Sequence, residues 1–361
     1  MITVPKHGGN LVWAADLADC TPADILDFSA SINPLGPPAS AVAAIQAHLP
    51  ALPNYPDPEY GALRQALSQV HHLPIEWILP GNGAAELLTW AGRELADLAA
   101  TCIVTPAFGD YFRALQTFSG AVVSWPIDLA ALGTSQTRLP LTVCPVAGSN
   151  QGLILSNPHN PIGQLLTRQD LLPYLETFAL VVIDEAFMDF LPPDQQESLI
   201  DQVLDYPNLV ILRSLTKFYS LPGLRLGYAI AHPDRLRRWQ TWRDPWPVNS
   251  LAAAAAIAIL QDTAFQQLTW SWLLRERAHL FQAMTAIPGL EPYPSAANFL
   301  LVRFQGSVAQ LQECLLKQHR ILIRDCQSFD ALGDRYFRVA VKSPEANQRL
   351  IQALTEISHH A

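Results

Sequence analysis

The chain has 361 residues, half of them hydrophobic and only 15% charged, with a net charge of −9. This length predicts a large core and two or three domains, and the lack of lysine- or arginine-rich runs excludes the usual footprint of a nucleic-acid-binding protein. The longest apolar run, residues 251–260, is too short to cross a bilayer, and the N-terminus lacks a signal-peptide pattern. The five cysteines are scattered, so we expect reduced thiols, no metal site and a cytoplasmic protein.

The first two thirds of the sequence predict an α/β arrangement. Residues 31–58 are rich in proline and indicate an extended arm with a helix over residues 39–49. Thr167 and Asp170 form a capping-box-like start for a helix that ends before residue 179. Strands are expected at residues 100–104, 121–125, 152–156, 179–184, 209–213 and 226–231. This alternation predicts a mainly parallel sheet covered by helices on both faces.

The pattern changes in the last third of the chain. Residues 248–285 predict helix throughout. Two further strands and two further helices are expected, at residues 298–302, 336–341, 308–318 and 345–357. We therefore expect an N-terminal arm with part of a small domain (1–50), a large domain (51–250) and a small α/β C-terminal domain (251–361).

Four polar motifs follow the predicted strands or open a helix. Lys217 lies in a turn after a buried strand, and parallel sheets bind ligands at the carboxyl ends of their strands. Desolvation at such a place frees an amine as a nucleophile. Asp184 ends another apolar strand, Asn157 begins a proline-rich loop, and the small-residue turn 81–86 can cradle a phosphate at a helix N-terminus. Each motif alone also fits a surface lysine, a cap, or an ordinary turn.

Taken in this order, the motifs resemble those of the fold-type I pyridoxal-phosphate enzymes over nearly the whole chain. The resemblance implies that Lys217 carries pyridoxal 5'-phosphate and is the catalytic residue. It implies that Asp184 pairs with the ring nitrogen, which lets the ring withdraw electrons, and that Asn157 donates to the ring oxygen. The other cofactor-binding residues that it implies are Phe108, which stacks on the ring, and the phosphate ligands Gly83, Ala84, Ala85, Ser214, Arg225 and, from a second subunit, Tyr55.

Further motifs are similar to those of the L-threonine-O-3-phosphate decarboxylases of cobalamin biosynthesis, close relatives of the histidinol-phosphate aminotransferases. They lie at residues 7–10, 27–36, 184–190, 245–249, 323–326 and 336–342. This resemblance, over about residues 5–357, implies a homodimer that decarboxylates L-threonine O-3-phosphate to (R)-1-amino-2-propanol O-2-phosphate. Arg338 is expected to bind the substrate carboxylate. The remaining substrate-binding residues are expected to be His7, Gly8, Gly9, Asn10, Asn157 and Arg324.

Other interpretations stay open on the sequence alone. Histidinol-phosphate aminotransferase is the nearest alternative, but Phe187 stands where those enzymes usually have a tyrosine, and the N-terminal His7–Gly8–Gly9 also speaks against it. A non-catalytic protein of the same fold would be expected to lack Lys217 or Asp184. A decarboxylase without a preference for phosphorylated substrates is a further alternative, but it would have no use for the expected phosphate ligands His7 and Arg324.

Overall fold

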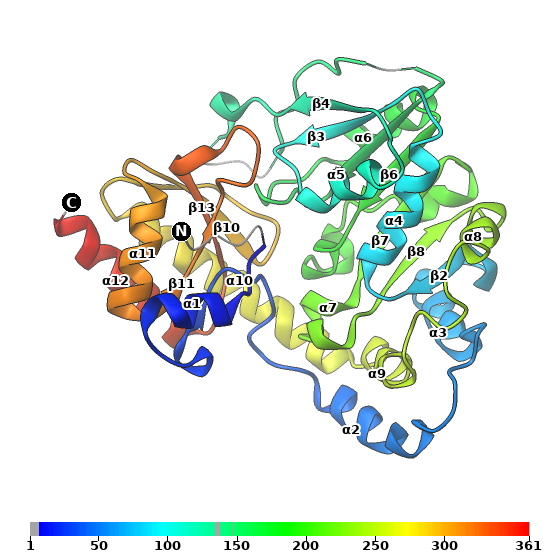
Figure 1. Ribbon diagram of the computed structural model, residues 1–361, viewed down its shortest axis with the longest axis horizontal. Helices are drawn as coiled ribbons and strands as arrows, with labels where there is room; N and C mark the ends of the chain where they lie inside the picture. Colours follow the sequence, from blue (N-terminus) through cyan, green and yellow to red (C-terminus); the bar gives the residue numbers. More distant parts are fainter. Residues whose placement is uncertain (1–6, 134–137, 147, 361) are drawn as a thin grey trace.

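The computed structural model describes residues 7–133, 138–146 and 148–360. Its larger sheet has seven strands in the order β2-β8-β7-β6-β5-β3-β4 (Figure 1). These strands are β2 (Ile78–Gly81), β3 (Ala100–Thr105), β4 (Val122–Pro126), β5 (Gln151–Ser156), β6 (Leu180–Asp184), β7 (Leu209–Ser214) and β8 (Gly227–Ala231). Only β8 runs against its neighbours β2 and β7, while the other neighbouring pairs are parallel. The predicted α/β fold with a mainly parallel sheet is therefore confirmed.

Helices cover both faces of this sheet. Ile103, Ile154 and Val182 point into one apolar cluster, and the residues just before them point into the other, as the two-residue repeat of a strand requires. The first cluster includes side chains from α4 (Ala84–Leu95), α5 (Gly109–Gln116) and α8 (Pro233–Gln240). The second includes side chains from α3 (Gly61–His71) and α6 (Arg168–Thr177). A sheet buried on both faces explains why its strands are continuous apolar runs.

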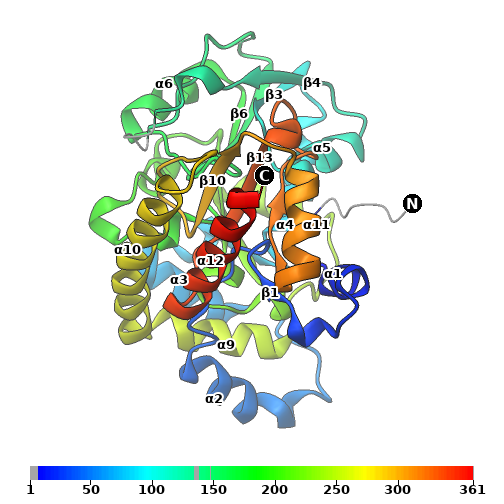
Figure 2. The ribbon, with the colours of Figure 1, turned by 90° about the vertical axis from the view of Figure 1, so that its left-hand side faces the viewer.

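A smaller antiparallel sheet has the order β12-β13-β10-β9. Its strands are β9 (Leu290–Pro292), β10 (Phe299–Phe304), β12 (Arg324–Asp325) and β13 (Tyr336–Ala340). Figure 2 shows α10 (Thr263–Thr285), α12 (Pro344–His360) and α11 (Val308–His319) side by side in front of β10 and β13. The predicted strands and helices of the C-terminal region are thus present.

The first part of the N-terminal arm, residues 7–28, lies beside this smaller sheet and forms a separate two-stranded sheet with β11. α1 (Leu11–Ala18) packs against α11, and β1 (Leu26–Asp27) pairs in parallel with β11 (Ile321–Leu322). Leu316 and Leu322 share an apolar cluster with α1. Segments from opposite ends of the chain therefore form one body beside the large sheet (Figure 1).

Two details of the prediction were wrong. The helix expected over residues 248–285 is divided into α9 (Ser250–Leu260) and α10, because the Asp262 carboxylate caps α10 by accepting from the Phe265 N–H at 3.0 Å. Strand β2 was missed.

The predicted domain boundary near residue 250 stays a prediction. Helix α9, which follows this boundary, packs against α2 (Ala39–His48) and α3. Within the described ranges, no helix is long and apolar enough to span a membrane.

Candidate active site

The predicted site residues lie at one edge of the large sheet. Asp184 is the last residue of β6, and Asn157 directly follows β5. Ser214 ends β7, and its side chain caps the short helix α7 (Leu215–Phe218), which carries Lys217. Because β5, β6 and β7 are parallel, their carboxyl ends meet at the same edge.

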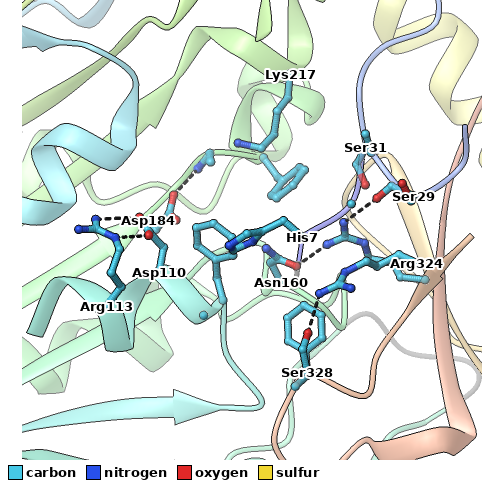
Figure 3. A pocket seen from close by; sticks show the side chains of 18 of the residues that line it. His7, Ser29, Ser31, Asp110, Arg113, Asn160, Asp184, Lys217, Arg324 and Ser328 are labelled. Atoms are coloured by element: carbon cyan, nitrogen blue, oxygen red, sulfur yellow. Dashed lines mark hydrogen bonds and ion pairs between the residues drawn. The ribbon is translucent and has the colours of Figure 1, made fainter. Parts of the chain in front are cut away.

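A cavity of about 870 Å³ opens between this edge and the smaller sheet (Figure 3). Lys217, Asp184 and Phe108 line what we call its lysine end, and the predicted anion ligands line what we call its arginine end. The arginine end consists of His7, Gly8, Arg324 and Arg338. In Figure 3, Asp184 and Arg324 lie on opposite sides of the cavity, with His7 between them. One cavity thus places an amine and a carboxylate opposite a group of cations.

Lys217 is in a setting that favours the neutral amine. Burial lowers the pKa of Lys217 below its ordinary value, Asp184 opposes this shift, and the guanidinium groups of Arg225 and Arg338 reinforce it. The Nζ atom lies 5.0 Å from the centre of the Phe187 ring. An amine that gives up its proton easily is the form that attacks an aldehyde.

Asp184 is held as an oriented carboxylate. Burial raises its pKa, while the charge of Lys217 and two hydrogen bonds oppose that rise. The Tyr111 hydroxyl donates to Oδ2 at 2.8 Å, and the Ala186 N–H donates to Oδ1 at 3.0 Å. Both carboxylate oxygens therefore have a donor, which favours the ionised form that a protonated ring nitrogen requires.

The predicted phosphate ligands come together behind the lysine end. Gly83 is the N-cap of α4, has a φ of +76°, and would place an added Cβ 2.5 Å from Nη2 of Arg225. Gly227 lies beside Ser214 in the sheet register, and a Cβ on it would lie 2.5 Å from the Ala84 nitrogen. The α4 N-terminus, where Ala84 and Ala85 begin the helix, Ser214 and Arg225 thus form a compact cradle. These groups suit a phosphate, because helix N–H groups and a guanidinium both bind anions.

Arg338 is buried at the arginine end with part of its guanidinium unused. Its Nη1 donates to Oδ1 of Asn160 at 2.5 Å, and its Nη2 donates to the carbonyl of Ser29 at 3.3 Å. Its Nε is buried and has no hydrogen-bond partner in the described part of the protein. Burial lowers the pKa of Arg338 to about 10. Because Arg338 is a buried cation that lines the cavity, an anionic ligand there would offset the cost of burying its charge.

Arg324 and the N-terminal residues complete the arginine end. Arg324 donates to the Ser328 hydroxyl at 2.6 Å, and its guanidinium lies 5.3 Å from the Phe329 ring centre. His7 packs edge-on against Phe108, with ring centres 6.0 Å apart. Gly9 and Asn10 do not line the main cavity but a small adjoining pocket, which His7, Gly8 and Arg324 share.

Besides Gly9 and the residues of the phosphate cradle, the predicted residues Asn10, Asn157 and Tyr55 do not belong to the described lining of the cavity. The Asn10 side chain caps α1 by accepting from the Trp13 N–H at 3.0 Å. The buried side chain of Asn157 bonds both backbone groups of Leu166, at 2.9 and 3.0 Å, which leaves one amide N–H for the predicted ring oxygen. Tyr55 is 79% exposed and stacks on Trp246 with ring centres 4.3 Å apart. The ligand roles of all three stay predictions.

The sequence analysis assigned no role to Tyr111 and Asn160, which contact Asp184 and Arg338 in the structure. Tyr111 is one helical turn beyond Phe108 on α5, and only the approach of α5 to β6 reveals its bond to Asp184. Asn160 lies in the proline-rich loop that drew attention in the sequence, yet its partner Arg338 is 178 residues away. Local patterns carry no signal for either contact.

Comparison with known proteins places the chain in one enzyme family, whose similar members include both decarboxylases and aminotransferases. Residues 23–354 match the aminotransferase class I and II family. The chain is 41% identical to threonine-phosphate decarboxylase from Salmonella typhimurium, over 97% of this chain and 96% of that protein. It is 34% identical to histidinol-phosphate aminotransferase from Symbiobacterium thermophilum, over 92% of this chain and 90% of that one. The crystal structure of L-threonine-O-3-phosphate decarboxylase from Porphyromonas gingivalis aligns with a TM-score of 0.80 at 28% identity, over 92% of this chain and 99% of that one.

Proposed function

The chain belongs to the aminotransferase class I and II family, and we propose that it decarboxylates L-threonine O-3-phosphate in cobalamin biosynthesis, with pyridoxal 5'-phosphate as cofactor. One observation carries the proposal: Lys217 and Asp184 face the same cavity as His7, Arg324 and Arg338. An amino acid that bears a second anionic group needs cations beyond the one that binds its carboxylate. The 41% identity to the Salmonella typhimurium enzyme supports this substrate over others.

The residues at the lysine end fit the cofactor. The cradle of Gly83, Ala84, Ala85, Ser214 and Arg225 would hold its phosphate, and the close packing of Arg225 on Gly83 leaves no room for a side chain there. Asp184 would hold the ring nitrogen in its protonated form. When bound, the cofactor accepts the electron pair that the substrate's α-carbon keeps when a bond to it breaks.

Lys217 has two tasks in this proposal. Its lowered pKa provides a neutral Nζ that can bind the cofactor and be displaced by the substrate's amine. Once displaced, Nζ lies in the cavity and can hold a proton. After carbon dioxide has left, that proton is delivered to the substrate's α-carbon.

The arginine end decides which bond breaks. The bond that is cleaved must stand perpendicular to the plane of the acceptor ring. Arg338 would bind the substrate's carboxylate, and its phosphate would be bound by His7, Gly8 and Arg324. Holding both ends of the substrate fixes its rotation, so that the bond to the carboxylate stands in the reactive orientation. An aminotransferase has to present the bond to hydrogen instead.

We also propose that the protein acts as a homodimer in the cytoplasm. Tyr55 and Trp246 form an exposed stacked aromatic pair, and Leu49 and Leu52 are exposed nearby in the sequence. Large apolar side chains exposed together are typical of interaction surfaces. In a dimer, Tyr55 would reach the cofactor phosphate of the second subunit.

The test is an assay of the purified holoenzyme with two substrate sets. With O-phospho-L-threonine we expect release of carbon dioxide, and with histidinol phosphate plus 2-oxoglutarate we expect no glutamate. Lys217→Ala should abolish carbon dioxide release, whereas Lys317→Ala should not, because Lys317 pairs with Glu313 on the exposed face of α11. Glutamate formation without carbon dioxide release would identify an aminotransferase and refute the proposal.

A further inference from the structure

The N-terminal residues 7–10, here called the glycine loop, lie against Ser29 at the edge of the cavity. His7, Gly8 and Ser29 line that cavity, whereas Asp27 does not belong to its described lining. We infer that Asp27 and Ser29 are positioning residues, which hold the glycine loop at the place where it can bind the substrate's phosphate. The inference rests on the proposed function and adds two residues that act by holding the glycine loop in place.

Ser29 links the glycine loop to Asp27 through one hydroxyl group. The hydroxyl donates its single hydrogen to Oδ1 of Asp27 at 2.6 Å and accepts from the Gly9 N–H at 2.7 Å. Because the carboxylate can only accept, the direction of both bonds is fixed. Ser29 is 2% exposed, whereas Gly9 is exposed and Asp27 is half-buried, so the two bonds are partly shielded from competing water.

Gly8 adds a steric condition to the same contact. A Cβ at Gly8 would lie 2.4 Å from the Ser29 carbonyl oxygen, so only glycine allows the loop to approach this closely. The same carbonyl accepts from Nη2 of Arg338 at 3.3 Å. Ser29 therefore touches the glycine loop on one side and the proposed carboxylate ligand on the other.

Asp27 and Phe28 are held by β11, which directly precedes Arg324, and by β13, which carries Arg338. It is aligned with Leu322 in the β1–β11 pair, and Arg324 lies two residues further on. The next residue, Phe28, donates to the Leu322 carbonyl and accepts from the Ala340 N–H, each at 2.8 Å, and Arg338 lies two residues before Ala340. The distance between the glycine loop and both arginines is thereby set through Asp27 and Ser29.

One oxygen of the Asp27 carboxylate accepts all the hydrogen bonds of this turn. Its Oδ1 accepts from the Ser29 N–H at 2.7 Å and from the Ala30 N–H at 3.3 Å, besides the Ser29 hydroxyl. A free carboxylate beside a phosphate site would repel the substrate. The Asp27 carboxylate stays outside the described lining of the cavity, and its charge favours the protonated form of Arg338.

Loss of this contact should weaken substrate binding and leave the chemistry intact. Ser29→Ala removes the acceptor of Gly9 and the donor to Asp27 together, so the glycine loop loses its position. We expect KM for O-phospho-L-threonine to rise about tenfold, the change that corresponds to one lost hydrogen bond near a charged group. The kcat and the absorbance of the bound cofactor should stay within about twofold of the wild type, since the lysine end is untouched.

The experiment compares four holoenzyme variants by steady-state kinetics and cofactor absorbance. Ser29→Ala, Asp27→Asn and Gly8→Ala should each raise KM, and the Gly8→Ala, Ser29→Ala double variant should be no worse than either change alone, because both break the same contact. The matched control is Asp24→Asn, whose exposed carboxylate makes the same kind of local turn with Thr21, at 2.8 and 3.0 Å. This control should leave KM unchanged. If Ser29→Ala does not fold, Gly8→Ala on the exposed loop carries the test.

Two outcomes separate this inference from the proposed function. If the wild type releases no carbon dioxide, the proposed function fails, and the contact is then tested by hydrogen–deuterium exchange of the peptide that contains Gly9. That exchange should become faster in Ser29→Ala and not in Asp24→Asn, and equal exchange would overturn the inference. If the wild type is active, an unchanged KM in Ser29→Ala and Gly8→Ala, or a loss confined to kcat or to cofactor retention, would overturn it.

Discussion

The two ends of the cavity are built in different ways. Lys217 and Asp184 at the lysine end stand within three residues of the ends of adjacent parallel strands, so the sheet itself positions them. The arginine end is assembled from segments at opposite ends of the chain, which meet through the short β1–β11 pair and the contacts of Ser29. We expect the lysine end to govern the rate of the chemistry and the arginine end to govern which substrate binds and how it is oriented.

The largest effect is expected from Asp184→Asn at the lysine end. An amide cannot keep the ring nitrogen protonated, so kcat should fall by about a hundred- to a thousandfold, the loss typical of removing one electrostatic group from a site. KM should change much less. A variant with nearly normal kcat would contradict the assignment of the carboxylate, and steady-state kinetics with O-phospho-L-threonine decides the matter.

A smaller effect of a different kind is expected from Arg338→Ala at the arginine end. Losing a buried charged contact costs about 2–3 kcal/mol, which corresponds to a KM higher by about 30- to 150-fold. The absorbance of the bound cofactor should be unchanged, since Arg338 lies outside the cradle. Arg303→Ala is a suitable control, because Arg303 is an exposed residue of the neighbouring strand β10. If the control raises KM equally, the effect does not come from the cavity.

Tyr111→Phe should have an intermediate effect and sharpen the description of the lysine end. It removes the hydrogen bond to Oδ2 of Asp184 and keeps the buried ring. A bond to a charged group contributes about 1.5–3 kcal/mol, so the cofactor should bind at least about tenfold more weakly. Titration of the apoprotein with pyridoxal 5'-phosphate measures this change. Unaltered affinity would mean that Tyr111 only fills space.

The smallest effects concern the pKa of Lys217, which both ends of the cavity influence. The pKa is lowered from 10.5, so in the apoprotein the rate of cofactor incorporation should rise with pH and level off below 10.5. The free energy of unfolding should rise with pH in the window between the lowered pKa and 10.5, because only the unfolded chain binds the proton there. Asp184→Asn should lower the pKa further, and Arg338→Ala should raise it. Shifts in the opposite directions would contradict the proposed geometry.

The difference between the sheet-based lysine end and the arginine end, which is assembled from distant segments, also explains which parts of the site could be predicted from the sequence. The strands of the large sheet are buried on both faces and appear as apolar runs, so their ends, and with them Asp184 and Lys217, could be located. Strand β2 was missed because its four residues include a proline and a glycine, which are unusual in strands. The break before α10 depends on a cap, and periodicity alone does not show it.

The arginine end was foreseeable only through resemblance to a known family. Nothing local to Arg338 indicates that its partners are Asn160 and the Ser29 carbonyl. Likewise, Asp27 and Ser29 belong to a motif that the sequence singles out, yet their contact with Gly9 depends on how the N-terminal arm folds back onto β11 and β13. Tertiary contacts between distant segments are the part of the site that sequence patterns do not encode locally.

The role of Lys217 as the residue that carries the cofactor is tested most directly by reducing the holoenzyme with borohydride and mapping its peptides. We predict that the pyridoxyl group is found on the ε-amine of Lys217, beside Asp184, and that the yellow absorbance disappears on reduction. A pyridoxyl group on another lysine such as Lys342, or an unmodified Lys217 in protein that retains the cofactor, would show that Lys217 does not carry the cofactor.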